Sequence, residues 1–266
     1  MSRYCFACLA LVAAVVLPRA DDPVKPGKLI ALFNGKDLTG LTTWLKDTKR
    51  DDPRKVFSVK DGMLHISGDG YGYVATAKEY KDYHLTVEYK WGQRTDGGKS
   101  VRNSGILLHG IGPDGGAGGA WMSCIECQLA QGCVGDLICI RGKDAKGKEI
   151  PVSVTGDVEI GPDKRPRWKE GGTKRVFPPG QYWWNKHEPF FKELLDTRGK
   201  DDVESPVGEW TKVECICEGQ RLTIKVNGHT VNQAYDVFPA AGKILLQSEG
   251  FELFVRKFEV QPVSGK

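Results

Sequence analysis

Short segments with alternating apolar and polar residues, separated by tight-turn pairs, make up most of the chain. Residues 83–91 (YHLTVEYKW) alternate cleanly, which places one face of a strand against a core. The pairs Asp61-Gly62 and Asn227-Gly228 favour two-residue turns and therefore predict β-hairpins. Many short strands with glycine-rich turns predict an all-β protein, an antiparallel sandwich or barrel. Further strands are expected within residues 57–67, 103–110, 124–130, 212–234 and 243–263.

One long region, residues 141–209, departs from this pattern. It is loop-like and rich in Gly, Pro, Lys and Asp, and the best short-helix candidate in the chain, residues 187–197, lies within it. Loops of this length are usually functional or disordered. Its aromatic content favours an excursion that packs back on the domain and walls a binding cleft. A structural cover over a sheet edge is an equal alternative. The aromatic residues are Trp168, Phe177, Tyr182, Trp183 and Trp184.

The N-terminus has the order of a secretory signal peptide over residues 1–20, with a short apolar run after Arg3 and cleavage after Ala20. A polar leader (21–28) and a single domain (29–262) follow. Without residues 1–20 the chain keeps 36 basic and 34 acidic residues, a net charge of +2. We therefore expect an exported protein, periplasmic or secreted, with no nucleic-acid partner and no membrane span after processing.

Six cysteines remain after this processing, four of them between residues 121 and 140 (WMSCIECQLAQGCVGDLICI). Their spacing does not match a zinc knuckle, and no βαβ unit supports a redox site. Cys124 and Cys127 point to opposite faces of a strand and cannot easily bridge each other. We expect buried apolar residues, with room for one disulfide. The six are Cys124, Cys127, Cys133, Cys139, Cys215 and Cys217.

Glu126 is the most informative polar residue of this stretch. Strand alternation places it beside Gln128 on one face, close to Trp121, with Cys124 on the same face. An unpaired buried glutamate is costly, so such a residue usually lines a cleft or is paired there. A solvated sheet face remains the alternative. The opposite face, toward the core, carries Ile125, Cys127 and Leu129.

Other polar residues select no reaction by spacing alone. His109 ends a strand before a glycine-rich loop, and a lone histidine is more often structural than catalytic. No Ser-His-Asp order, HExxH motif, phosphate loop or EF-hand loop is present. Several carboxyls could serve glycoside hydrolysis, but no pair stands out. The remaining candidates include Asn103, Ser104, Asp136, Gln247, Glu249 and Arg256.

Together, ordered segments across residues 29–262 resemble the 3-keto-disaccharide hydrolase domain family of exported bacterial proteins. They are LFNGKDLTG, NSGILLHG, IECQL, GEW, VNG, and ILLQSEG followed by FVRKFEV. The resemblance implies a concanavalin A-like jelly-roll sandwich and chemistry on glycosides that carry a ketone at carbon 3. A base removes the hydrogen on carbon 2, the glycosidic oxygen leaves carbon 1, and water adds back.

Residue by residue, Glu126 matches the family's strand glutamate and would be the base or a ligand to substrate or metal. His109 would be an acid or base, although many members have Arg there, and Glu249 stands where many have His. A divalent metal could polarise the ketone, with no ligand set defined. A non-catalytic carbohydrate-binding module and a structural cell-envelope domain are the alternatives. Substrate-positioning residues would be Gln128, Asn103, Ser104, Trp121, Asp136, Gln247 and Arg256.

Overall fold

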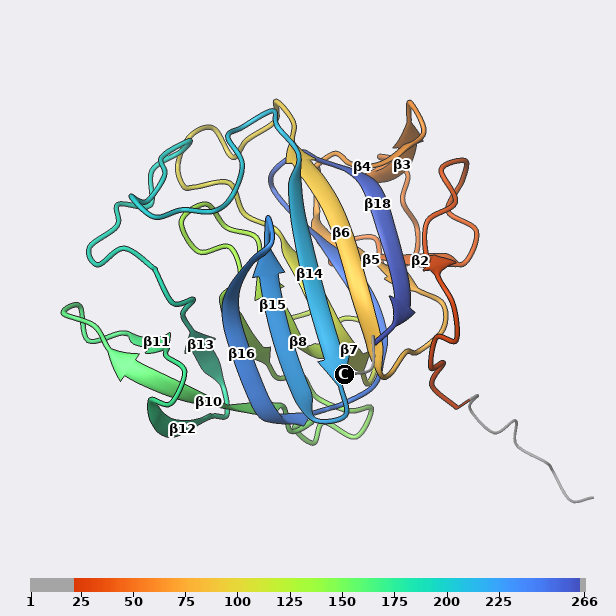
Figure 1. Cartoon of the computed structure of the whole chain (residues 1–266). Coiled ribbons are helices and arrows are strands. Elements are labelled where there is room, and N and C mark those ends of the chain that lie inside the picture. Colours follow the sequence, from red (N-terminus) through yellow and green to blue (C-terminus); the bar gives the residue numbers. More distant parts are fainter. Residues whose placement is uncertain (1–21, 264–266) are drawn as a thin grey trace, which may run out of the picture.

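Two antiparallel β-sheets packed face to face form the protein (Figure 1). The computed structural model describes residues 22–263, so the expected signal peptide lies outside the described residues. Residues 22–263 contain no helix, and hence none that could cross a bilayer. The all-β antiparallel fold predicted from the alternating segments is therefore confirmed.

The larger sheet has eleven strands. Two of them lie off the main path: β1 (Ile30–Ala31) pairs with β18, and β12 (Thr173–Phe177) pairs with β10. The order along the main path is β11 (Pro166–Trp168), β10 (Ser153–Ile160), β16 (His229–Phe238), β15 (Arg221–Val226), β14 (Thr211–Glu218), β6 (Tyr83–Trp91), β18 (Leu253–Pro262), β4 (Met63–Ile66) and β3 (Phe57–Lys60).

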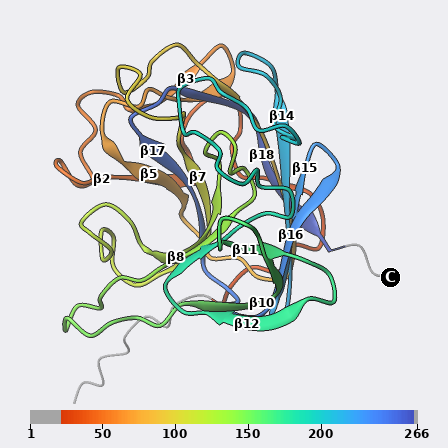
Figure 2. The ribbon, with the colours of Figure 1, turned by 90° about the vertical axis from the view of Figure 1, so that its left-hand side faces the viewer.

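The smaller sheet has seven strands and lies behind the larger one in Figure 1; Figure 2 shows the two layers from the side. Its order is β13 (Gly180–Tyr182), β9 (Leu137–Ile140), β8 (Ser123–Gln128), β7 (Gly105–Ile111), β17 (Lys243–Glu249), β5 (Tyr71–Thr76) and β2 (Leu41–Leu45).

Local turn chemistry sets the hairpins. Asp61 and Gly62 both have positive φ (52° and 74°), as do Asn227 and Gly228 (48° and 85°). Two positive φ angles define the turn type that matches the strand twist, and Asn-Gly and Asp-Gly pairs adopt it at low cost. The hairpins β3–β4 and β15–β16 therefore form where the sequence predicts them.

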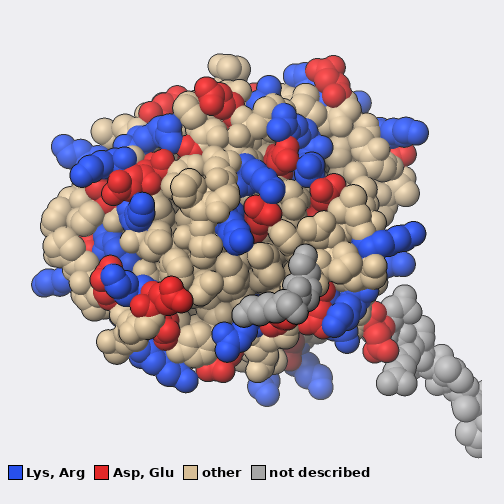
Figure 3. Space-filling view, viewed as in Figure 1, with Lys and Arg blue, Asp and Glu red and all other residues tan. Residues whose placement is uncertain are grey.

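The space between the sheets holds the main core. Side-chain alternation in β6 sends Leu85, Val87, Tyr89 and Trp91 into it, as predicted. In β8 the core side carries Ile125 and Cys127, so Glu126 between them points out of the sandwich. Charges of both signs are interspersed over the outside of the larger sheet (Figure 3).

The region 141–209 is not one continuous loop. Strands β10, β11, β12 and β13 occupy much of residues 153–182 and extend both sheets. Residues 141–152 and 183–210 are the two longer stretches of this region without helix or strand, and the expected helix at 187–197 is therefore absent. Phe190 and Leu194 are 74% and 57% exposed. Without a packed apolar face, a helix of eleven residues is marginal in water.

All six cysteines of the described residues are buried, as predicted, and all are free. The disulfide for which the sequence left room is therefore not formed among them. Cys127, Cys139, Cys215 and Cys217 belong to the main core, whereas Cys124 faces outward beside Glu126. A core of this size does not need a disulfide for stability.

Candidate functional site

The outer face of the seven-stranded sheet is divided into an apolar part and a polar part. The apolar part is covered by Trp44, Trp121 and the loop before β8. Trp44 Nε1 donates a hydrogen bond to the Gly119 carbonyl (3.0 Å), and the Tyr73 hydroxyl donates to Asp114 Oδ1 (2.6 Å), so this loop is tied to the sheet. The buried residues beneath are Tyr73, Ala75, Leu107, Met122, Cys124 and Leu245.

Polar side chains gather on the rest of this face around Gly105 of β7. Leu107 pairs with Glu126 of β8, and Leu245 of β17 pairs with Leu107, so Glu126 and Gln247 flank β7 from its two neighbours. A Cβ on Gly105 would lie 2.3 Å from Glu126 Oε1 and 2.6 Å from Gln247 Oε1. The missing side chain at position 105 is thus what lets these two groups meet above the strand. We call Asn103, Gly105, Glu126, Gln247 and Glu249 the Glu126 cluster.

Two carboxyls of the Glu126 cluster have raised pKa values. Burial raises the pKa of Glu126 well above its usual range; the nearby Glu249 charge adds to this and the Gln247 amide opposes it. Burial alone raises the pKa of Glu249 to about 7. Asn103 Nδ2 donates to Glu249 Oε2 at 3.1 Å. Burial thus favours the protonated form of Glu126, while Glu249 ionises near neutral pH, and such a pair suits acid–base catalysis.

Two amide oxygens of the cluster lack partners. Within residues 22–263, Asn103 Oδ1 and Gln247 Oε1 are buried and accept no hydrogen bond. Buried acceptors without a partner are uncommon in folded proteins and call for an explanation such as a bound water, ion or ligand. The cluster is therefore a polar site with unused binding capacity.

Gln128 and Asp136 continue this face from Glu126. Gln128 pairs with Gly105, and its backbone N–H donates to the Asp136 carbonyl at 2.9 Å. Asp136 is fully buried; its Oδ1 accepts the Trp184 N–H (2.7 Å) and its Oδ2 accepts Gln181 Nε2 (2.6 Å). Burial raises the pKa of Asp136 to about 7.

The other predicted residues lie in different places. Ser104 is buried and donates to the Gln247 carbonyl (3.1 Å), so it supports the cluster from the backbone side. Trp121 packs against the apolar part of the face with Cys124. These two residues can shape the site without contacting the reacting atoms.

His109 and Arg256 are not brought to the Glu126 cluster. The His109 ring contacts core residue Tyr83 (centroids 5.6 Å apart), and its Nδ1 lies 2.8 Å from the Pro239 carbonyl. Burial lowers the pKa of His109 to about 4. Arg256 is exposed on the outer face of the other sheet, where its Nε donates to Glu88 Oε2 (2.6 Å).

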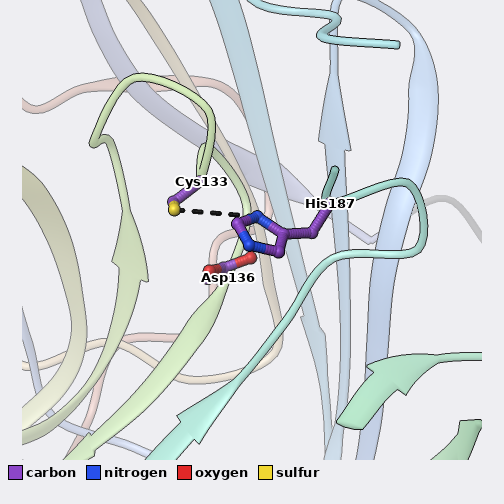
Figure 4. A group of neighbouring side chains, drawn as sticks. All are labelled: Cys133, Asp136 and His187. Atoms are coloured by element: carbon purple, nitrogen blue, oxygen red, sulfur yellow. Dashed lines mark hydrogen bonds between the residues drawn. The ribbon is translucent and has the colours of Figure 1, made fainter. Parts of the chain in front are cut away.

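A second polar group was missed at the sequence level. Cys133, Asp136 and His187 lie together, buried, with one potential ligand atom from each within 4.8 Å of the others (Figure 4). Such a group could hold a metal ion. The sequence interpretation treated Cys133 as a packing residue and placed His187 in a helix. The two residues are 54 positions apart, so no local pattern indicates that they meet.

Gly105 was also missed, although an isolated glycine inside an apolar strand signals a close approach.

A model of the 3-keto-alpha-glucoside-1,2-lyase-like domain family matches residues 28–261. The chain belongs to this family. The match confirms the resemblance carried by the ordered sequence segments and places the chain in a carbohydrate-active family. A comparison with curated proteins found no match.

Solved structures share the architecture of this family member at low sequence identity. A proposed glycosyl hydrolase from Parabacteroides distasonis ATCC 8503 is 18% identical, with a TM-score of 0.50 over 89% of this chain and 94% of that chain. A β-glucanase from Bacillus licheniformis is 10% identical, with a TM-score of 0.47 over 89% and 99% of the two chains. The first likeness shows the fold, a jelly-roll β-sandwich.

The raised pKa of Glu249 predicts a pH dependence of stability. Its carboxyl holds a proton up to about pH 7 when folded, but only to about pH 4.5 when unfolded. Between these values the native state binds more protons, so the free energy of unfolding falls as pH rises. A Glu249→Gln variant has no carboxyl to titrate, so its free energy of unfolding should not fall in this way. Relative to the wild type, its free energy of unfolding should therefore rise by up to about 3 kcal/mol between pH 4.5 and pH 7. Urea unfolding of both proteins at several pH values measures the gain. A constant difference would contradict the prediction.

Proposed function

We propose that this chain is an exported enzyme that cleaves the glycosidic bond of 3-keto-glycosides, such as 3-keto-disaccharides, by elimination followed by hydration. The observation that carries the proposal is that Glu126, which is buried, and Glu249, which is partly buried, lie on one face of a domain of this family and both have raised pKa values. Elimination needs a base and an acid on the same substrate, and the Glu126 cluster offers both.

Proton transfers can be assigned to the two carboxyls by their pKa values. Glu249, which ionises near pH 7, takes the hydrogen on carbon 2, made acidic by the neighbouring ketone. The electron pair moves into the carbon 2–carbon 3 bond and onto the ketone oxygen as an enolate. When the ketone re-forms, a double bond forms between carbons 1 and 2 and the carbon 1–oxygen bond breaks. Glu126, which stays protonated, donates its proton to the departing oxygen. Water then adds across the double bond.

Amide groups of the same cluster suit the charge that develops. Asn103 and Gln247 line the site with Gln128 beside them, and their N–H groups can donate to the enolate oxygen. The unpartnered oxygens Asn103 Oδ1 and Gln247 Oε1 also fit a hard divalent cation. Such an ion would polarise the ketone when bound. The two amide oxygens would be its ligands, which leaves Glu126 and Glu249 free for proton transfer.

Product release from an oxidised substrate tests this function. The purified protein is incubated with a 3-keto-disaccharide and with its unoxidised parent, each with and without a chelator. We expect cleavage of the keto substrate only, because the parent has no acidic hydrogen on carbon 2. Sugar binding without turnover across a broad substrate panel would support a carbohydrate-binding module instead. Loss of turnover with the chelator would assign a metal to the reaction. Export is tested by fractionating cells that express the full chain.

A further inference from the structure

Cys133, Asp136 and His187 converge from two segments of the chain. Cys133 and Asp136 lie in the turn between β8 and β9, and His187 lies in the segment that follows β13 (Figure 4). All three are buried. We propose that they form a transition-metal site, with Zn²⁺ as the ion that fits, and that the ion ties the 183–189 segment to the β8–β9 turn. This group is separate from the Glu126 cluster.

The spacing of the ligand atoms fits tetrahedral zinc. Zinc–sulfur bonds of about 2.3 Å and zinc–nitrogen bonds of about 2.0 Å at a tetrahedral angle place sulfur and nitrogen about 3.5 Å apart. The Cys133 Sγ–His187 Nδ1 distance is 3.8 Å. A carboxylate oxygen of Asp136 lies within 4.8 Å of the Cys133 Sγ and of a ring nitrogen of His187. Only small side-chain adjustments would bring all three atoms to one ion.

The donor set selects the class of metal. A thiolate and an imidazole favour zinc and other borderline or soft ions, whereas calcium and magnesium take oxygen ligands. Thiolate and carboxylate carry two negative charges, which a divalent ion neutralises. The Asp136 oxygens also accept hydrogen bonds from the Trp184 N–H and Gln181 Nε2, so the carboxylate is held in place by outer partners.

Nucleophilic chemistry is the competing interpretation of a Cys–His–Asp group, and the hydrogen bonding disfavours it. The Cys133 Sγ lies 3.8 Å from His187 Nδ1, which carries the ring proton because Arg165 Nη1 donates to Nε2, so the imidazole is not placed to accept the thiol proton. A reactive cysteine needs a stabilised thiolate. A bound cation supplies that stabilisation, because a coordinating thiol loses its proton.

Ion binding requires a defined set of proton movements. His187 Nε2 lies 3.0 Å from Arg165 Nη1, which can only donate, so Nδ1 carries the ring proton and faces the Gly132 carbonyl at 3.2 Å. Coordination through Nδ1 moves the ring proton to Nε2, releases the Cys133 thiol proton to solvent, and requires Arg165 to turn away. Arg165 is 40% exposed and already lies 3.8 Å from Asp163, toward which it can turn.

Access to the site comes from a pocket of about 580 Å³ that His187 lines together with residues of the 183–189 segment. A water from this pocket can fill the fourth coordination position, which three protein ligands leave open. The site also lies next to the Glu126 cluster, because Asp136 is paired with Gln128. The ion would thus hold one wall of the polar face in place.

Cobalt spectroscopy on the full chain tests the proposal without any assay of activity. The purified protein is stripped with a chelator, its fold is checked by circular dichroism, and Co²⁺ or Zn²⁺ is added. We expect one ion per chain, a thiolate-to-cobalt charge-transfer band, and a rise in melting temperature with Zn²⁺. A folded wild-type protein that shows no such band overturns the proposal.

Matched serine variants identify the ligand. Cys133→Ser should lose the band and weaken Zn²⁺ binding by more than the roughly 10–100-fold that loss of an outer partner costs. Cys139→Ser is the control, since this buried cysteine donates to the Phe177 carbonyl (3.4 Å) and lies outside the group. His187→Gln gives a second ligand variant if Cys133→Ser fails to fold. A band that persists in Cys133→Ser, or is lost equally in Cys139→Ser, contradicts the assignment.

Discussion

A Glu126→Gln variant is expected to cleave a 3-keto-disaccharide about 10²–10⁴-fold more slowly than the wild type, the range that one positioned acid or base contributes. Glutamine keeps the shape of the side chain but cannot deliver a proton to the departing sugar oxygen. Because Glu126 is buried and its raised pKa favours the neutral carboxyl, which glutamine resembles, the substitution should leave the fold intact. Initial rates and melting temperatures, measured side by side, separate catalysis from stability.

Leaving-group chemistry distinguishes the role of Glu126 from that of Glu249. A 3-keto-glycoside of p-nitrophenol needs little help from an acid, so Glu126→Gln should regain much of its rate on it, whereas Glu249→Gln should stay slow on both substrates. The opposite pattern would exchange the two roles. Glu88→Gln is the matched control, since Glu88 lies on the outer face of the other sheet, paired with Arg256. Its rate should be unchanged on either substrate.

Local sequence rules predicted the hairpins and strand faces because those features depend on neighbouring residues. The turns at Asp61-Gly62 and Asn227-Gly228 need only residues that accept positive φ, and alternation alone decides which way Glu126 points. Of the strands in residues 153–182, β11 and β12 pair locally with β10, but β10 and β13 join the two sheets only through distant partners, and no local signal specifies those pairings. β10, for example, completes its ladder with β16, about 80 residues later.

The residues of the candidate site were predictable from the sequence only where they share one strand. Glu126 and Gln128 do so, and the alternation of side chains along that strand predicts that they lie on the same face. Gln247 and Glu249 join them only because β17 pairs with β7, and nothing local specifies that pairing. His109 shows the limit of parity: the register of β7 shifts between Leu108 and Ile111, and the histidine turns to the core. A bulge of this kind reverses the face expected from simple alternation.

Gly105→Ala is expected to disable the site through a single methyl group. The added Cβ would lie 2.3 Å from Glu126 Oε1 and 2.6 Å from Gln247 Oε1, so both side chains must move. The backbone itself gives no obstacle, because Gly105 is not among the residues with positive φ. Overpacking of this kind costs about 1–3 kcal/mol of unfolding free energy. Turnover of the keto substrate should fall at least tenfold, since displacements of about 1 Å reduce rates by up to about 100-fold.

A double-mutant cycle assigns the cost to the contact itself. If the alanine methyl collides with the Glu126 carboxyl, then Gly105→Ala should destabilise the wild type more than it destabilises Glu126→Ala, in which the carboxyl is gone. We expect a coupling of about 0.5–3 kcal/mol between the two positions, the range found for residues in contact. Urea unfolding of the wild type, the two single variants and the double variant gives this value. Additive effects would mean that Glu126 does not occupy the space above Gly105, and the geometry assigned to the proton donor would then be wrong.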